Sequence, residues 1–152
     1  MQTSNNLWMR APAERIYPLA AEVERWPELL PHYRWVTVLE RDGNRKLVEM
    51  AARRDWIPVS WQAVQELDPQ TPLIRFRHVR GITTGMEVEW RFEPRDGGTL
   101  VTIRHALELR WPLIGAWAAE HVIGPHFVAH IAGKTLQRIK QLAESPLPIG
   151  GG

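Results

Sequence analysis

The stretch GMEVEWRFEPRDGGTLVTIRHAL, residues 85–107, decides the fold class of this chain. In both halves of the stretch, apolar side chains alternate with polar ones, which is the period of a β-strand with one buried face. The segment RDGG, residues 95–98, joins the halves and has the glycine-containing composition of a hairpin turn. The stretch therefore predicts an antiparallel hairpin, with an inner face that carries Met86, Val88, Trp90, Phe92, Val101, Ile103, His105 and Leu107.

The same period extends upstream over two more segments. Residues 33–54 predict a hairpin with its turn at Asp42-Gly43-Asn44, and residues 56–81 predict a hairpin with its turn around Asp68-Pro69. Residues 3–10 are predicted as a short first strand. The alternation in the two hairpins predicts a shared inner face made of Val48, Met50, Ala52, Val59, Trp61, Ala63, Gln65, Ile74, Phe76 and His78.

Helical patterns flank these strands. Residues 11–23 repeat apolar side chains at helical spacing, and Pro18 predicts a kink or an early end there. WPELLP, residues 26–31, allows one or two further turns, and an apolar stripe from about Pro112 to Glu144 predicts one long helix. The element order predicts an α+β fold, in which a curved antiparallel sheet of about seven strands wraps on the C-terminal helix, with two short helices between strands 1 and 2.

The composition is that of an ordinary globular domain. The chain has 152 residues, a formal net charge of +2 and no cysteine. It has no run of like charges and no long apolar segment, so we expect no nucleic-acid partner and no membrane span. The N-terminus lacks a signal-peptide pattern, which favours the cytoplasm. We expect one domain over residues 1–145 and a flexible tail over residues 146–152, while the oligomeric state stays unknown.

Two histidines, His78 and His105, fall on the predicted inner face. Histidine exchanges protons near neutral pH, so both are candidate catalytic residues; the alternative is a pair of hydrogen-bonded structural histidines. Arg54 and Arg80 share the inward register at strand ends, where they could reach a pocket mouth or remain solvated.

A metal site is not expected. His126 and His130 lie four residues apart on the predicted helix and could share a metal, but no carboxylate is placed beside them as a third ligand. We therefore expect surface histidines, no metal and no cofactor.

The predicted inner face is rich in aromatic and methionine side chains, which is typical of a pocket for an apolar, ring-bearing ligand. The segment ERWPELLPHYRW, residues 24–35, adds aromatic side chains that could close one end of the sheet. The alternative is a filled core without a cavity. We predict ligand contacts from Tyr33, Trp35, Met50, Arg54, Trp61, Phe76, Met86, Trp90, Ile103, Trp117 and His121.

Four segments together resemble the polyketide cyclase/dehydrase branch of the START-like superfamily, which has the helix-grip fold. They are APAERIYPLAAEVERWPELLPHYRWVTVLERDG at residues 11–43, GMEVEWRFEP at 85–94, GGTLVTIRHAL at 97–107 and WPLIGAWAAEHVIGPHFVAHIAGKTLQRIKQLAE at 111–144. The resemblance covers nearly the whole chain and implies a cavity between sheet and helix that takes a hydrophobic small molecule.

The resemblance implies a polyketide cyclase or aromatase-like activity on a ketide or aromatic ligand. A histidine would move protons, while an arginine or Tyr33 would polarise a carbonyl. Related aromatase/cyclases are expected to carry an arginine on the strand that holds a tryptophan. Here that strand reads WIPVSWQAVQEL, in which Trp61 fits but no arginine follows. A non-catalytic carrier of a lipid or quinone, and an interaction module with a filled core, stay open as alternatives.

Overall fold

The computed structural model describes residues 2–54, 57–81, 83–107 and 125–145. Every statement about the structure below refers to these residues. Their elements follow the chain in the order β1 (Gln2–Met9), α1 (Ala13–Ala21), the 3-10 turn η1 (Val23–Arg25), α2 (Trp26–Leu29), β2 (Tyr33–Asp42), β3 (Arg45–Arg54), β4 (Ile57–Asp68), β5 (Leu73–Gly81), β6 (Glu87–Arg95), β7 (Gly98–Ala106) and α4 (Pro125–Glu144).

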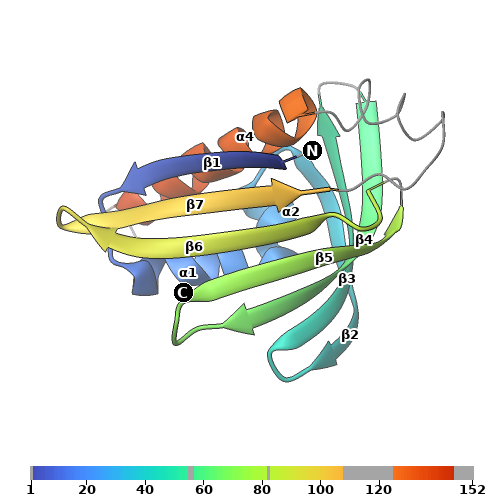
Figure 1. Cartoon of the computed structure of the whole chain (residues 1–152), viewed down its shortest axis with the longest axis horizontal. Helices are drawn as coiled ribbons and strands as arrows, with labels where there is room; N and C mark the ends of the chain where they lie inside the picture. Colours follow the sequence, from blue (N-terminus) through green and yellow to red (C-terminus); the bar gives the residue numbers. More distant parts are fainter. Residues whose placement is uncertain (1, 55–56, 82, 108–124, 146–152) are drawn as a thin grey trace.

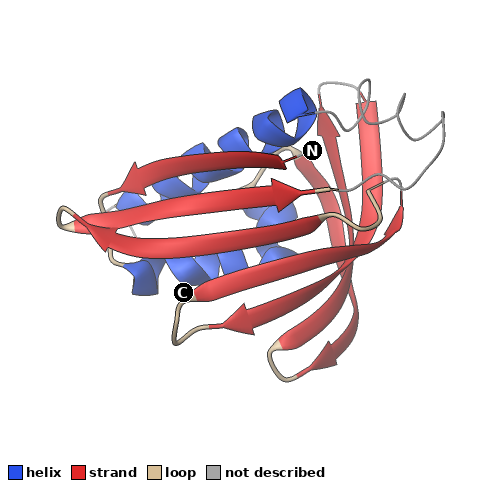
Figure 2. Cartoon of the chain, viewed as in Figure 1, coloured by secondary structure: helices blue, strands red, loops and turns tan. Residues whose placement is uncertain are grey.

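The strands form one antiparallel sheet in the order β1-β7-β6-β5-β4-β3-β2. The sheet is strongly curled, and the described helices lie on one of its faces (Figures 1 and 2). The predicted α+β helix-grip architecture is confirmed, with seven strands and short helices between the first two.

The three hairpin turns lie where the sequence predicts them. In the β6–β7 turn, Asp96 and Gly97 both adopt positive φ values, of 53° and 78°. Successive positive φ values give a turn whose twist matches that of the flanking strands. Local turn chemistry therefore sets the register of the β6–β7 pair, in which Trp90 lies opposite Ile103 on the inner face.

The short helices connect β1 to β2 and are tied to the sheet by polar side chains. Helix α1 continues past Pro18 to Ala21 and ends where the Glu22 N–H donates to the Pro18 carbonyl at 3.0 Å. The fully buried Gln65 donates from Nε2 to the Ala21 carbonyl at 2.9 Å, which fixes the end of α1 against β4. The Trp26 indole N–H donates to the Leu19 carbonyl at 3.0 Å, so α2 folds back on α1.

Helix α4 packs along β1 and α1. Asn5 donates from Nδ2 to the Ala129 carbonyl at 3.3 Å, and the Arg10 N–H donates to the Glu144 carboxylate at 2.8 Å. These two contacts hold both ends of the described helix, while its apolar face completes the core. That face carries Val128, Ile131, Ala132, Leu136, Ile139 and Ala143. The part of the predicted helix before residue 125 lies outside the described residues.

Candidate functional site

A cavity of about 80 Å³ lies between the inner face of the sheet, α2 and α4. Its wall is predominantly apolar and aromatic, with a small number of polar side chains, as is typical of small-molecule sites. The described lining consists of Trp26, Tyr33, Met50, Val59, Trp61, Phe76, His78, Thr83, Met86, Val88, Trp90, Ile103, His105, Val128, Ile131, Ala132 and Thr135.

Trp26 organises the aromatic part of this wall. Its ring meets Tyr33 edge-on at 4.8 Å between centroids and lies 6.0 Å from Trp90 and 6.2 Å from Phe76. Edge-on and tilted contacts of this kind are the favoured arrangements of aromatic pairs. The proline-rich segment between α1 and β2 therefore contributes its tryptophan to the cavity wall.

His78 is held by two neighbours on the cavity wall. Its Nδ1 lies 2.7 Å from the Thr83 hydroxyl, and its ring stacks on Trp61 at 5.4 Å with 7° between the planes. Burial, and to a lesser extent electrostatic repulsion from His105, lower the pKa of His78 to about 3. The ring is therefore neutral at pH 7, with Nδ1 occupied by the threonine.

His105 lies two strands away from His78 and differs in its hydrogen bonding. Its buried Nδ1 has no partner among the described residues, and the same holds for Nε1 of Trp61. Burial lowers the pKa of His105 to about 4, so this imidazole is also neutral at pH 7. A buried polar atom without a partner costs about 1–3 kcal/mol. Both atoms belong to residues that line the cavity.

The structure brings most of the predicted site residues together around this cavity. They are Tyr33, Met50, Trp61, Phe76, His78, Met86, Trp90, Ile103 and His105. Their contact with a ligand stays a prediction. Trp117, His121 and the side chain of Arg54 lie outside the described residues.

The prediction that Trp35 points into the cavity is wrong. Tyr33 pairs with Ala52 and Trp35 pairs with Ala51, so Arg34 is an extra residue opposite the continuous strand β3. This β-bulge shifts the alternation by one residue, and the Trp35 side chain is 37% exposed. Val36 takes the inward position opposite Met50 instead.

The inward placement of Arg80 is wrong for the same reason. His78 pairs with Ala63 and Arg80 pairs with Gln62, which leaves Val79 as an extra residue in β5. The bulge turns Arg80 to the outer face, where its side chain is exposed. The described cavity lining consequently holds no arginine or lysine.

Sequence reasoning missed two threonines of the wall. Thr83 lies two residues after Gly81 in the β5–β6 connection, and its approach to His78 depends on the turn in which the Met86 N–H donates to the Thr83 carbonyl at 3.0 Å. Thr135 lies four residues after Ile131 on α4, so helical spacing could have placed it on the inner face.

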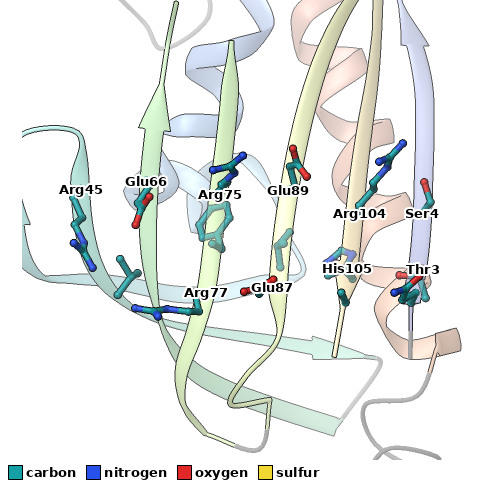
Figure 3. A pocket seen from close by; sticks show the side chains of 15 residues that line it. Thr3, Ser4, Arg45, Glu66, Arg75, Arg77, Glu87, Glu89, Arg104 and His105 are labelled. Carbon is teal, nitrogen blue, oxygen red and sulfur yellow. The ribbon is translucent and has the colours of Figure 1, made fainter. Parts of the chain in front are cut away.

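The outer face of the sheet has a larger and open hollow of about 1070 Å³ (Figure 3). The strand registers place Glu66 opposite both Arg45 and Arg75. They also place Glu89 opposite both Arg75 and Arg104. A row of alternating charges across five strands stabilises a solvated sheet face, so we do not assign the functional site to this hollow.

None of the described helices is long and apolar enough to cross a membrane. The curled sheet, the helix packed against it and the apolar cavity between them define the helix-grip fold. Residues 9–121 match the model of the family described as polyketide cyclase/dehydrase and lipid transport. The chain belongs to this family.

One curated relative is the granaticin polyketide synthase bifunctional cyclase/dehydratase of Streptomyces violaceoruber. It is 32% identical over 107 residues, which are 68% of this chain but 33% of the relative. The chain therefore matches about a third of the length of that protein.

Solved structures support the fold over nearly the whole chain. The Zhui aromatase/cyclase from Streptomyces sp. R1128 superposes with a TM-score of 0.86 at 20% identity, over 100% of this chain and 98% of that one. A START superfamily protein from Mycobacterium smegmatis superposes with a TM-score of 0.66 at 19% identity, over 92% of each chain.

Proposed function

We propose that this protein is a polyketide cyclase/dehydratase-like enzyme that binds a ketone-bearing aromatic or ketide ligand in the sheet–helix cavity. The observation that carries the proposal is the pair of buried nitrogen atoms, Trp61 Nε1 and His105 Nδ1, which have no partner among the described residues and belong to a predominantly apolar wall. An indole N–H donates only, so its natural partner is an oxygen of the ligand. Membership of the polyketide cyclase/dehydrase family supports the same substrate class.

We assign the separate steps of ring closure to different polar residues of the cavity wall. Closure of a ketide ring requires removal of a proton next to one carbonyl, attack on a second carbonyl and loss of water. We assign the polarising hydrogen bond to Trp61 or the Tyr33 hydroxyl, and the proton transfer to His105, whose Nδ1 is not occupied by a protein group. Nδ1 of His78 is hydrogen-bonded to Thr83, so we assign His78 a positioning role: its ring stacks on Trp61 and holds that ring in place.

The cavity must widen to take such a ligand. Its volume of about 80 Å³ equals the share of two or three water molecules in the liquid, at roughly 30 Å³ each, whereas ligand pockets span roughly 300–1,000 Å³. Met50 and Met86 are unbranched and have several rotatable bonds, so they are the wall residues best suited to move aside.

A matched pair of small probes tests the proposed polar contact. 2-Acetylnaphthalene and 2-ethylnaphthalene differ by one carbonyl oxygen, and their affinities can be compared by quenching of tryptophan fluorescence. We expect the ketone to bind more tightly to the natural protein by about tenfold, because one satisfied buried donor is worth about 1–3 kcal/mol. Trp61→Phe keeps a ring in place but removes the N–H, so it should abolish this preference.

The control is Trp90→Phe, which alters the wall without touching either unpartnered nitrogen. This variant should keep the preference for the ketone. Equal affinities of both probes for the natural protein would contradict the proposal. The catalytic part is tested separately with a ketide substrate, for which His105→Gln should bind substrate but lose most of the turnover.

A non-catalytic carrier of a lipid or quinone is the second candidate. Two observations favour it: the pKa of His105 is lowered to about 4, far below that of an efficient base at neutral pH, and the described lining holds no arginine. Native mass spectrometry of the freshly purified protein separates the two candidates. A bound quinone or lipid supports the carrier, whereas a bound ketide or polyphenol supports the enzyme.

We further propose that the protein acts in the cytoplasm as a single domain over residues 1–145. Cell fractionation tests the location. Truncation after Ser145 should leave the melting temperature unchanged, because α4 ends at Glu144.

A further inference from the structure

A second hollow of about 380 Å³ lies where the connection between α2 and β2, the end of β3 and the outer side of α4 meet. We call it the α4 pit, and it is lined by Pro31, His32, Arg53, Lys134, Gln137, Arg138 and Gln141. This described lining contains three cationic side chains and no carboxylate. Its volume is within the roughly 300–1,000 Å³ of small-molecule sites.

The cationic side chains of the pit are available to a ligand. Those of Arg53 and Lys134 make no ion pair or hydrogen bond with any described residue, unlike Lys46 on β3, which pairs with Glu24 at 3.1 Å. Arg138 is held in place, because its Nε donates to the Leu29 carbonyl at 3.0 Å and its Nη1 donates to Gln141 at 3.2 Å. A guanidinium carries five N–H groups, so this fixed side chain still has donors for an anion.

The inner wall of the pit is a buried histidine. His32 is 8% exposed, and its Nε2 lies 2.8 Å from the hydroxyl of Thr135. That hydroxyl also donates to the Ile131 carbonyl at 2.8 Å. Burial, followed by the positive charge of Lys134 and then by His130, lowers the pKa of His32 to about 4.

We propose that the α4 pit is a second ligand site, separate from the cavity, that binds a phosphate group through Arg53, Lys134 and Arg138. Three cationic side chains that line one hollow without a carboxylate favour a doubly charged anion over a singly charged one. Arginine presents paired N–H groups that match the geometry of phosphate oxygens. Gln137 and Gln141 supply further polar groups at the rim. The proposal does not depend on the ligand of the cavity or on any catalytic activity.

Nuclear magnetic resonance on the whole chain tests this site directly. Inorganic phosphate is titrated at constant ionic strength while the side-chain amide signals of Gln137 and Gln141 are followed. We expect saturable shifts with a dissociation constant in the millimolar range, and acetate should bind at least several times more weakly. Glycerol 3-phosphate in a parallel titration identifies the source of the phosphate: equal or tighter binding indicates an ester, and weaker binding indicates the free ion.

A pair of double variants separates the site from general electrostatics. Arg53→Gln with Lys134→Gln should weaken phosphate binding about tenfold or more. Arg77→Gln with Arg104→Gln removes the same charge from the outer sheet face and should leave the dissociation constant within about twofold (Figure 3). Shifts that rise linearly without saturation, or equal weakening in both double variants, would overturn the proposal.

Discussion

At the scale of single residues, the hydroxyl of Thr83 provides the hydrogen-bond partner of the buried Nδ1 of His78. The Thr83 side chain is buried, and its oxygen lies 2.7 Å from Nδ1 of the histidine. Thr83→Val preserves the shape of the side chain but leaves Nδ1 of His78 without a partner. We expect the free energy of unfolding to fall by about 1–3 kcal/mol, measured by urea denaturation.

The control for this variant is Thr102→Val on β7. Thr102 is partly exposed and its hydroxyl makes no hydrogen bond with a described residue, so its replacement should change the free energy of unfolding by less than about 0.5 kcal/mol. If Thr83→Val were as stable as Thr102→Val, the contact between Thr83 and His78 would not contribute to stability.

At the scale of elements, the end of β5 brings its backbone unusually close to β4. Gly81 has φ of +105°, and a Cβ added there would lie 2.9 Å from the Ser60 carbonyl oxygen and 3.1 Å from Trp61 Cα. Gly85 has a similar φ of +96° but open space around it. Comparing the two glycines therefore separates backbone strain from collision.

Gly85→Ala should lower the free energy of unfolding by about 1–3 kcal/mol through backbone strain alone. Gly81→Ala should cost about 1–3 kcal/mol more, because backbone atoms of β4 must shift to admit the methyl group. Thermal unfolding of both variants gives the comparison. Equal losses of stability in the two variants would mean that β4 shifts to admit the methyl group at no cost in free energy.

At the scale of the whole molecule, buried neutral histidines make stability depend on pH. Burial lowers the pKa of His78 to about 3 and that of His105 to about 4, whereas both titrate near 6.5 in the unfolded chain. At pH values between the folded pKa values and 6.5, the unfolded chain binds more protons than the folded protein. The free energy of unfolding therefore falls as the pH falls below about 6.5, and it is independent of these groups above that pH.

The expected slope is about 1.4 kcal/mol per pH unit for each of His78 and His105 between pH 6 and pH 5. His32, whose pKa is also lowered to about 4 by burial, adds a contribution of the same sign. Urea denaturation at pH 7.5, 6.0 and 5.0 measures it. His78→Gln should remove the share of the slope that His78 contributes, which is about half of the sum for His78 and His105. An unchanged slope in His78→Gln would show that His78 is not held neutral by burial.

Much of the fold could be predicted from the sequence, because its main signals are local. Alternation with a period of two identified the strands, and glycine-containing turns fixed where they reverse. The same alternation placed His78, Trp90 and His105 on the inner face, where the structure has them. These predictions hold because the pairing of β6 with β7, and of β5 with β4 from Leu73 to His78, is uninterrupted.

Only the tertiary structure decided the side-chain orientations and contacts that depend on partners distant in the sequence. Two bulges turned Trp35 and Arg80 outward, because register is set by the neighbouring strand and not by the residue's own strand. His32 and Thr135 are 103 positions apart and meet only when α4 packs across the sheet. The sequence by itself thus determined the strands, their turns and most of the cavity wall, while long-range pairing and packing decided the wall's polar contacts and the α4 pit.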